Sequence, residues 1–207
     1  MKNTLFKAIG IILVIGAIGV QTISCSSEFE RIDFLAPGEG GISSVRGSSS
    51  SRALSSSSSA IPSSSSVAPS ITYGSLYDSR DGKTYKTVVI GSQTWMAENL
   101  NYNASGSVCY GNNTSNCDTY GRLYNWNTAM AACPSGWHLP SDAEWTALTD
   151  FAGGVSTAGW HLKSASGWSS GGNGQDTYGF AALPGGGGLS DGTFFADEYN
   201  RWWSATE

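Results

Sequence analysis

The start of a helix is predicted at Trp137-His138-Leu139-Pro140-Ser141-Asp142-Ala143-Glu144-Trp145. The Ser141 hydroxyl can accept a hydrogen bond from the backbone N–H of Glu144, and the Glu144 carboxylate can accept one from Ser141, which together make a capping box. The carboxylates of Asp142 and Glu144 also suit the positive end of the helix dipole. We therefore expect Glu144 to serve as a structural cap rather than as a catalytic acid.

The residues after this start carry one apolar face. Trp145, Leu148 and Phe151 recur near helical spacing, and Gly153-Gly154 marks the end of the helix. Before the quoted stretch, residues 123–132 have weaker helical spacing and end at a Cys-Pro pair. The pattern predicts two short helices.

Strand signals lie on both sides of these helices. Residues 84–90 are rich in Thr, Tyr, Val and Ile, and Gly91-Ser92 separates them from a return strand at 93–96. From residue 158 onward, short strand-like pieces alternate with long Gly-, Trp- and Ser-rich loops. Ordered loops of this kind often carry function.

Residues 1–24 have the features of a bacterial signal peptide. Lys2 and Lys7 flank the start of an uncharged apolar run, residues 8–20, that is too short to span a bilayer comfortably as a helix. Residues 22–25, Thr-Ile-Ser-Cys, resemble a lipobox, although Thr22 stands where Leu is usual. The resemblance implies cleavage before Cys25 and lipidation of its sulfur, which would hold the protein on the membrane. The alternative is an ordinary signal peptide that leaves Cys25 as a thiol.

A tether and a displayed domain are predicted after the anchor. Residues 26–30 are similar to the Ser/acidic export signals of surface lipoproteins, so we expect an outer-membrane lipoprotein exposed on the bacterial cell surface. Residues 25–70 include long serine runs without a hydrophobic period, which indicates a disordered linker because little apolar area can offset the entropy of ordering. The globular domain is expected at 71–207, where all eight Trp residues lie.

The charge and the cysteines of the sequence bear on its partners, its disulfides and its metal binding. The formal net charge is −5 and no cluster of Lys and Arg is present, so we expect no nucleic-acid partner. Cys109 and Cys117 bracket a short polar loop, and in an exported protein such a pair most often forms a disulfide. Too few further ligands stand nearby for zinc.

Several motifs resemble the Fibrobacter succinogenes major paralogous domain. They are residues 81–85, 90–100, 120–126, 133–145 and 202–207, and the resemblance runs in order over about residues 77–207. The stretch from Leu139 to Trp145 is also similar to formylglycine-generating-type enzymes, which have a C-type-lectin-like fold. The resemblance therefore implies an α+β, C-type-lectin-like domain with two short helices and short antiparallel strands. It does not imply the activity, because those enzymes use a late cysteine pair and no Cys follows Cys133.

The resemblance also bears on Cys133. With Cys25 lipidated and Cys109 paired with Cys117, this cysteine has no partner in the sequence. In the family the chain continues beyond the Trp-Trp-Ser-Ala-Thr-Glu string to a late Cys. The resemblance thus implies that the partner of Cys133 lies beyond Glu207 and that the sequence is a fragment.

The sequence contains one candidate ligand site. Asp191, Asp197, Glu198 and Asn200 lie near aromatic residues that include Trp202 and Trp203, so a calcium-assisted or stacking sugar site is one interpretation. The other interpretation places both Trp side chains on a core strand and the acids on a solvated loop. No calcium motif is present, so we expect no cofactor.

These features favour a non-catalytic binding domain on an envelope lipoprotein, with polysaccharide or a surface protein as its ligand. His138 and His161 are expected to be packed, and Gly167 to Gly171 fits G-x-S-x-G without the strand, helix and later His of a nucleophile elbow. The alternatives are a structural envelope protein and, less favoured, a degenerate formylglycine-generating-type enzyme.

Overall fold

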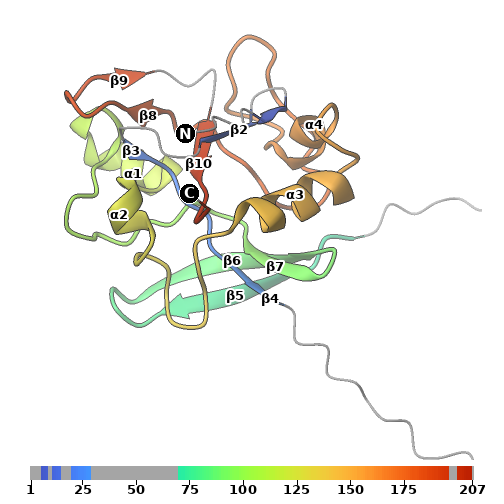
Figure 1. Cartoon of the computed structure of the whole chain (residues 1–207), viewed down its shortest axis with the longest axis horizontal. Helices are drawn as coiled ribbons and strands as arrows, with labels where there is room; N and C mark the ends of the chain where they lie inside the picture. Colours follow the sequence, from blue (N-terminus) through green and yellow to red (C-terminus); the bar gives the residue numbers. More distant parts are fainter. Residues whose placement is uncertain (1–5, 9–10, 15–19, 29–69, 196–199, 207) are drawn as a thin grey trace, which may run out of the picture. The chain divides into compact units, whose positions relative to one another are not determined.

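The computed structural model describes residues 6–8, 11–14, 20–28, 70–195 and 200–206 (Figure 1). The chain divides into two units, of which one comprises residues 1–29 and 71–207 and contains all the helices and strands described below. The predicted linker lies outside the described residues from 29 to 69, as do parts of the predicted signal peptide.

The main sheet has four antiparallel strands in the order β4-β7-β6-β5 (Figure 1). They are β4 (Ser26–Glu28), β5 (Tyr73–Asp78), β6 (Lys83–Ile90) and β7 (Gln93–Met96). Strands β6 and β7 form the predicted hairpin, in which Ile90 opposes Gln93. Its turn uses Gly91 with a φ of +64°, which glycine adopts without steric cost.

The remaining strands form two smaller sheets. One contains β3 (Val20–Gln21), β8 (Gly187–Gly188) and β9 (Phe194–Phe195), and the other contains β1 (Phe6–Ala8), β2 (Ile11–Val14) and β10 (Asn200–Trp203). The apolar run of the predicted signal peptide, residues 8–20, contains β2 and the adjoining ends of β1 and β3, and β2 runs parallel to β10. Its β-branched residues suit an extended chain. None of the helices in the described residues has the length and apolar character needed to cross a membrane.

The helices are short. The structure has a 3-10 helix, η1 (Tyr110–Asn112), and four α-helices: α1 (Thr114–Tyr120), α2 (Trp126–Ala129), α3 (Asp142–Phe151) and α4 (Ala158–Leu162). The helix predicted over 123–132 exists only as α2, because the Asn125 side chain accepts the Thr128 N–H and starts the helix there. Helices α1 and α4 were not predicted. With helices and antiparallel sheets together, the fold is α+β.

The capping box of α3 is confirmed. The Ser141 hydroxyl accepts the N–H of Glu144, and the Glu144 carboxylate accepts the N–H of Ser141. The prediction for Phe151 is wrong, because 52% of it is exposed, whereas Ala152 is fully buried. Six residues turn a helix by about 600°, which is about 120° away from Trp145, whereas seven residues return to nearly the same direction.

The core is built around Trp side chains. Trp95 of β7 and Trp145 of α3 lie with ring centroids 4.9 Å apart, and Trp202 of β10 lies 6.2 Å from Trp145. A second cluster surrounds Tyr124 and Trp203. Both clusters lie against the main sheet and β10, so the aromatic residues fix the positions of the strands.

Residues 21–26, which precede the predicted domain start at residue 71, are also buried in this core. Ile23 and Cys25 are fully buried in the cluster around Tyr124. The carbonyl groups of Ile23 and Cys25 accept the N–H groups of Leu100 and Met96, at 3.0 Å each. The segment from Gln21 to Ser27, here called the N-terminal strand, therefore pairs with the domain instead of preceding it.

Candidate functional site

A polar cleft of about 280 Å³ lies where the start of β6, the chain after β7 and helix α1 meet. Its lining contains one ammonium group, two carboxylates, and several amides and hydroxyls beside two tyrosines. The lining residues are Lys83, Thr84, Tyr85, Glu98, Asn99, Asn101, Cys117, Asp118, Thr119, Tyr120, Gly121 and Leu183. The sequence did not predict this site, because its residues come from separate segments of the chain, although several of them lie in the motifs 81–85, 90–100 and 120–126.

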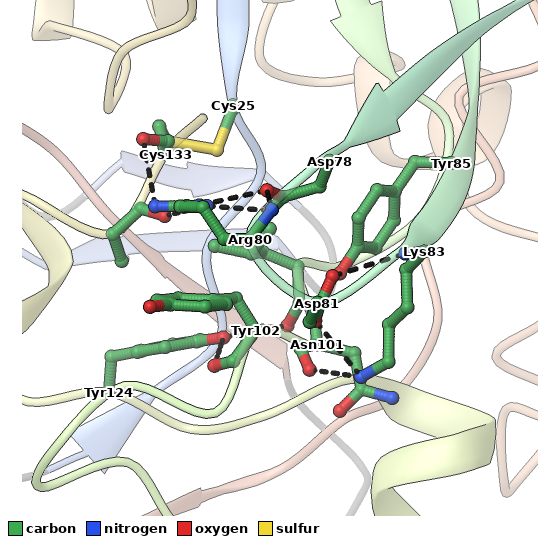
Figure 2. A network of polar contacts seen from close by, with 12 residues as sticks. Cys25, Asp78, Arg80, Asp81, Lys83, Tyr85, Asn101, Tyr102, Tyr124 and Cys133 are labelled. Atoms are coloured by element: carbon green, nitrogen blue, oxygen red, sulfur yellow. Dashed lines mark hydrogen bonds and ion pairs between the residues drawn. A yellow bond between two sulfur atoms is a disulfide. The ribbon is translucent and has the colours of Figure 1, made fainter. Parts of the chain in front are cut away.

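Lys83 and Tyr85 form one wall in the lining of the cleft, and Figure 2 shows their contacts with Asp81 and Asn101. The Lys83 ammonium donates to the carbonyl of Asn101 at 2.6 Å and lies 3.5 Å from the Asp81 carboxylate. The Tyr85 hydroxyl accepts the N–H of Asn101 at 3.2 Å. Burial raises the pKa of Tyr85 to about 12, so its phenol stays protonated and neutral. This wall therefore presents one ammonium group, from Lys83, and one neutral phenol, from Tyr85.

Another part of the lining, here called the acid and amide wall, consists of Glu98, Asn99 and Asp118. The side-chain N–H of Asn99 donates to the carbonyl of Tyr120, and its oxygen accepts the indole N–H of Trp202, both at 2.9 Å. Asn99 is thus held in place by the core. Glu98 accepts the backbone N–H of Lys86, whereas Asp118 is exposed on α1. The cleft can therefore accept and donate hydrogen bonds at once, as a ligand with several hydroxyl groups requires.

Helix α1 is fastened at this wall by a disulfide. Cys109 and Cys117 are bonded, as predicted, and their Cα atoms are 5.1 Å apart. Gly121 ends α1 with a φ of +75°, and a Cβ there would come within 2.9 Å of two backbone carbonyl oxygens. Only glycine fits this approach, so the disulfide and Gly121 together set the position of Asp118.

A guanidinium clamp lies beside the cleft (Figure 2). Arg80 donates to both carboxylate oxygens of buried Asp78 and to the carbonyls of Ala132 and Cys133, and it lies 3.9 Å over the Tyr102 ring. The hydrogen bond from Arg80 holds the pKa of Asp78 below its usual range. Because these contacts use most of its donors, Arg80 ties β5 to the Cys133 loop and is not offered to a ligand.

Ser26, His138 and Glu144 form a third polar cluster. Glu144 Oε1 lies 2.6 Å from His138 Nε2 and accepts from Ser26 Oγ at 2.9 Å. Ser26 Oγ lies 3.3 Å from the same His138 nitrogen. A Ser-His-Glu relay needs the acid on the other ring nitrogen, so this cluster acts as a structural link between the N-terminal strand and α3.

We expect this cluster to make stability fall in acid. Burial alone would raise the pKa of Glu144, but hydrogen bonds from Ser141, His138 and Ser26 outweigh it and lower the pKa. A lowered folded-state pKa adds stability that is present above the unfolded value, near 4.5, and is lost as pH falls through the folded value. Urea unfolding of the wild type and Glu144→Gln from pH 7 down to 3 measures this. The difference in stability between them should shrink in acid, and a constant difference would contradict the assignment.

The residues predicted as a ligand site are not brought together as one. Trp202 and Trp203 are fully buried, and their indole N–H groups donate to Asn99 and to the Tyr124 carbonyl. Asn200 is also buried and donates to the Leu183 carbonyl. Asp191 is exposed in a turn, where it accepts the N–H of Thr193. This placement agrees with the interpretation that puts both Trp side chains on a core strand, and a ligand on the surface cannot reach either Trp ring.

The remaining predicted acids, Asp197 and Glu198, lie outside the described residues. Over the described ranges, the chain has no group of three or more His, Cys, Asp and Glu side chains placed to hold a metal ion. His161 is half-buried on α4, and its Nδ1 lies 2.9 Å from the Thr177 hydroxyl. Ser169 is exposed in a loop, without the strand and helix of a nucleophile elbow around it.

The structure also gives Cys25 and Cys133 a different role from the predicted one. Their sulfurs are bonded to each other, and the Cα atoms lie 5.9 Å apart. This pairing corrects the expectation that the partner of Cys133 lies beyond Glu207. A sulfur in a disulfide cannot also carry a thioether-linked lipid, so this structure and the predicted lipidation of Cys25 exclude one another.

Comparisons with known proteins agree with the motif resemblance. The model of the Fibrobacter succinogenes major domain matches residues 88–207, more than half of the chain. No curated protein and no solved structure matches the chain. The matched residues include β7, the acid and amide wall of the cleft, α3 and β10. The chain belongs to the Fibrobacter succinogenes major domain family.

Proposed function

We propose that this chain is an exported bacterial domain that binds a neutral saccharide in the polar cleft without transforming it. The observation that carries the proposal is the lining of the cleft, where an ammonium and two carboxylates stand around amides, hydroxyls and tyrosines. Sugar hydroxyls both donate and accept, and they match such a mixed set better than a charged ligand does. The protonated Tyr85 and the already bonded Lys83 favour binding over proton transfer.

Export to the cell envelope is part of the proposal. The two disulfides support it, since disulfides persist in oxidising compartments. The lipobox-like residues 22–25 support an anchored outer-membrane form displayed at the surface. In that form Cys25 would be lipidated and Cys133 would lack its present partner. The C-type-lectin-like fold stays a proposal as well, supported by the α+β arrangement and the sequence resemblance.

Carboxylate removal tests the cleft. The variant Glu98→Gln/Asp118→Asn is expected to bind saccharides at least about tenfold more weakly, because hydrogen bonds to charged groups contribute about 1.5–3 kcal/mol each. Isothermal titration with a panel of neutral mono- and disaccharides measures the affinity of the full chain.

The matched control is Asp191→Asn, which changes an exposed carboxylate in the turn before β9. It should bind as the wild type does. No binding by the wild type to any saccharide of the panel, or equal binding by the cleft variant, would overturn the proposal.

A further inference from the structure

A stripe of half-exposed aromatic rings lies on the surface next to the cleft. We define the aromatic stripe as Tyr73 of β5, Phe151 of α3 and Tyr178 of the loop that follows α4. The rings of Phe151 and Tyr178 meet edge to face, with centroids 5.3 Å apart, and His161 of α4 lies 5.9 Å from Tyr178. Separate chain segments therefore place apolar rings together where water can reach them.

The loop that carries Tyr178 is held in a demanding backbone conformation. Asp176 and Ala181 both have positive φ values, 48° and 53°, which non-glycine residues rarely adopt. The Ala181 N–H donates to the Asp176 carboxylate at 2.7 Å and closes the loop. At Gly179 a Cβ would lie 2.9 Å from the Tyr73 hydroxyl, so the loop packs directly on β5. These constraints hold Tyr178 in the stripe despite their conformational cost.

The stripe begins beside the cleft, because the cleft residue Glu98 accepts the backbone N–H of Lys86, whose ammonium lies 5.9 Å from the centre of the Tyr73 ring. A small cavity of about 10 Å³ shares Glu98 and Asn99 with the cleft and also reaches Ala181. A ligand seated beside Glu98 can therefore extend past Lys86 onto Tyr73 and the rest of the stripe.

Hydrogen-bonding groups lie beside the rings. The Thr177 hydroxyl and His161 stand next to Tyr178, Asp176 stands near Tyr73, and Lys86 lies 5.9 Å from the centre of the Tyr73 ring. A pyranose ring has C–H groups on its faces and hydroxyl groups around its edge, so it can stack on an aromatic ring while its hydroxyls reach such neighbours. The formal net charge of −5 and the carboxylates of the cleft disfavour a polyanionic chain.

We propose that the aromatic stripe binds the continuation of a neutral polysaccharide chain whose first units occupy the cleft. This inference rests on the proposed function and names its ligand as a polymer rather than a small sugar. Affinity should therefore rise with chain length. Each stacked ring is expected to contribute about a threefold to tenfold gain.

The test compares disaccharides with hexasaccharides of glucose, mannose, xylose and galactose, using titration calorimetry on the full chain. For the oligosaccharide that binds the wild type best, Phe151→Ala/Tyr178→Ala should lower hexasaccharide affinity at least tenfold and leave disaccharide affinity unchanged. Glu98→Gln/Asp118→Asn should weaken both. The control Leu189→Ala removes an exposed apolar side chain of 46% exposure outside the stripe and should change neither.

The outcomes separate the two proposals. Equal hexasaccharide affinity in the wild type and the stripe variant, with weaker binding by the cleft variant, would overturn the polymer inference and leave the proposed function standing. Equal affinity of the wild type for disaccharides and hexasaccharides would also overturn the polymer inference and leave the proposed function standing. Failure of the wild type to bind any of these sugars would overturn both. Circular dichroism shows whether each variant is folded, and Tyr178→Phe, which keeps the ring, should retain hexasaccharide affinity.

Discussion

The double variant Cys25→Ser/Cys133→Ser is expected to lose about 5 kcal/mol of unfolding free energy, because its disulfide closes a long loop. The two cysteines are 108 residues apart, and the entropy that a cross-link removes from the unfolded chain grows with loop length. The lost bond also frees the N-terminal strand, which is buried from Gln21 to Ser26. Equilibrium unfolding in guanidinium chloride, followed by Trp fluorescence, measures the loss.

The second disulfide provides the matched control. Cys109 and Cys117 are only 8 residues apart, so Cys109→Ser/Cys117→Ser should cost about 2.5 kcal/mol by the same loop-entropy argument. Both variants replace two sulfurs with hydroxyls, so the difference between their losses of unfolding free energy does not come from that chemical change. Equal losses for the two variants, or a larger loss for the short loop, would show that the N-terminal strand is not joined to the domain in solution.

Trp203→Ala is expected to destabilise the protein by about 4 kcal/mol, since truncating a buried Trp to Ala typically costs about 3–5 kcal/mol. Trp203 is fully buried beside Tyr124 and Ile23. Its indole N–H donates to the Tyr124 carbonyl at 2.7 Å, and the variant also leaves that buried acceptor without this donor. Urea unfolding of the variant and the wild type measures the difference.

Trp160→Ala is the control for this prediction. The Trp160 side chain on α4 is 51% exposed, so its removal should change the unfolding free energy by less than about 1 kcal/mol. Similar effects of the two substitutions would contradict the placement of Trp203. A stable Trp203→Ala protein that had lost saccharide binding would instead favour the stacking site that the sequence suggested.

The sequence predicted best what neighbouring residues determine. The capping box at Ser141 and Glu144 depends on two residues three positions apart, and the turn at Gly91 depends on one flexible residue between two β-rich runs. The disulfide between Cys109 and Cys117 was predicted for the same reason, because it closes a short loop. Each of these features can form without reference to the rest of the chain.

The candidate site could not be predicted in this way. The cleft forms only after Lys83, Glu98 and Asp118, which come from β6, the chain after β7 and α1, pack around one space. The acids near Trp202 and Trp203 looked like a site because they are close in sequence, but β10 turns both rings into the core. The mixture of acidic and aromatic residues around Trp202 and Trp203 does not indicate which of these side chains face solvent.

The N-terminal strand was missed for a different reason. An apolar run followed by a Cys has the pattern of a signal peptide and lipobox, and the same pattern of Thr22, Ile23 and Cys25 also fills a buried strand. Its partners, among them Met96, Leu100 and Cys133, lie more than 70 positions away. The same residues therefore fit both an export signal, which is local in sequence, and a buried segment, whose partners are distant in sequence.

Peptide mapping of the protein isolated from its own cell envelope, without reduction, tests most directly whether the N-terminal strand completes the domain. We expect the peptides that contain Cys25 and Cys133 to be joined, and to separate when a reductant is added. A peptide that begins at a lipidated Cys25, with Cys133 free or bonded elsewhere, would contradict the N-terminal strand and favour the anchored lipoprotein.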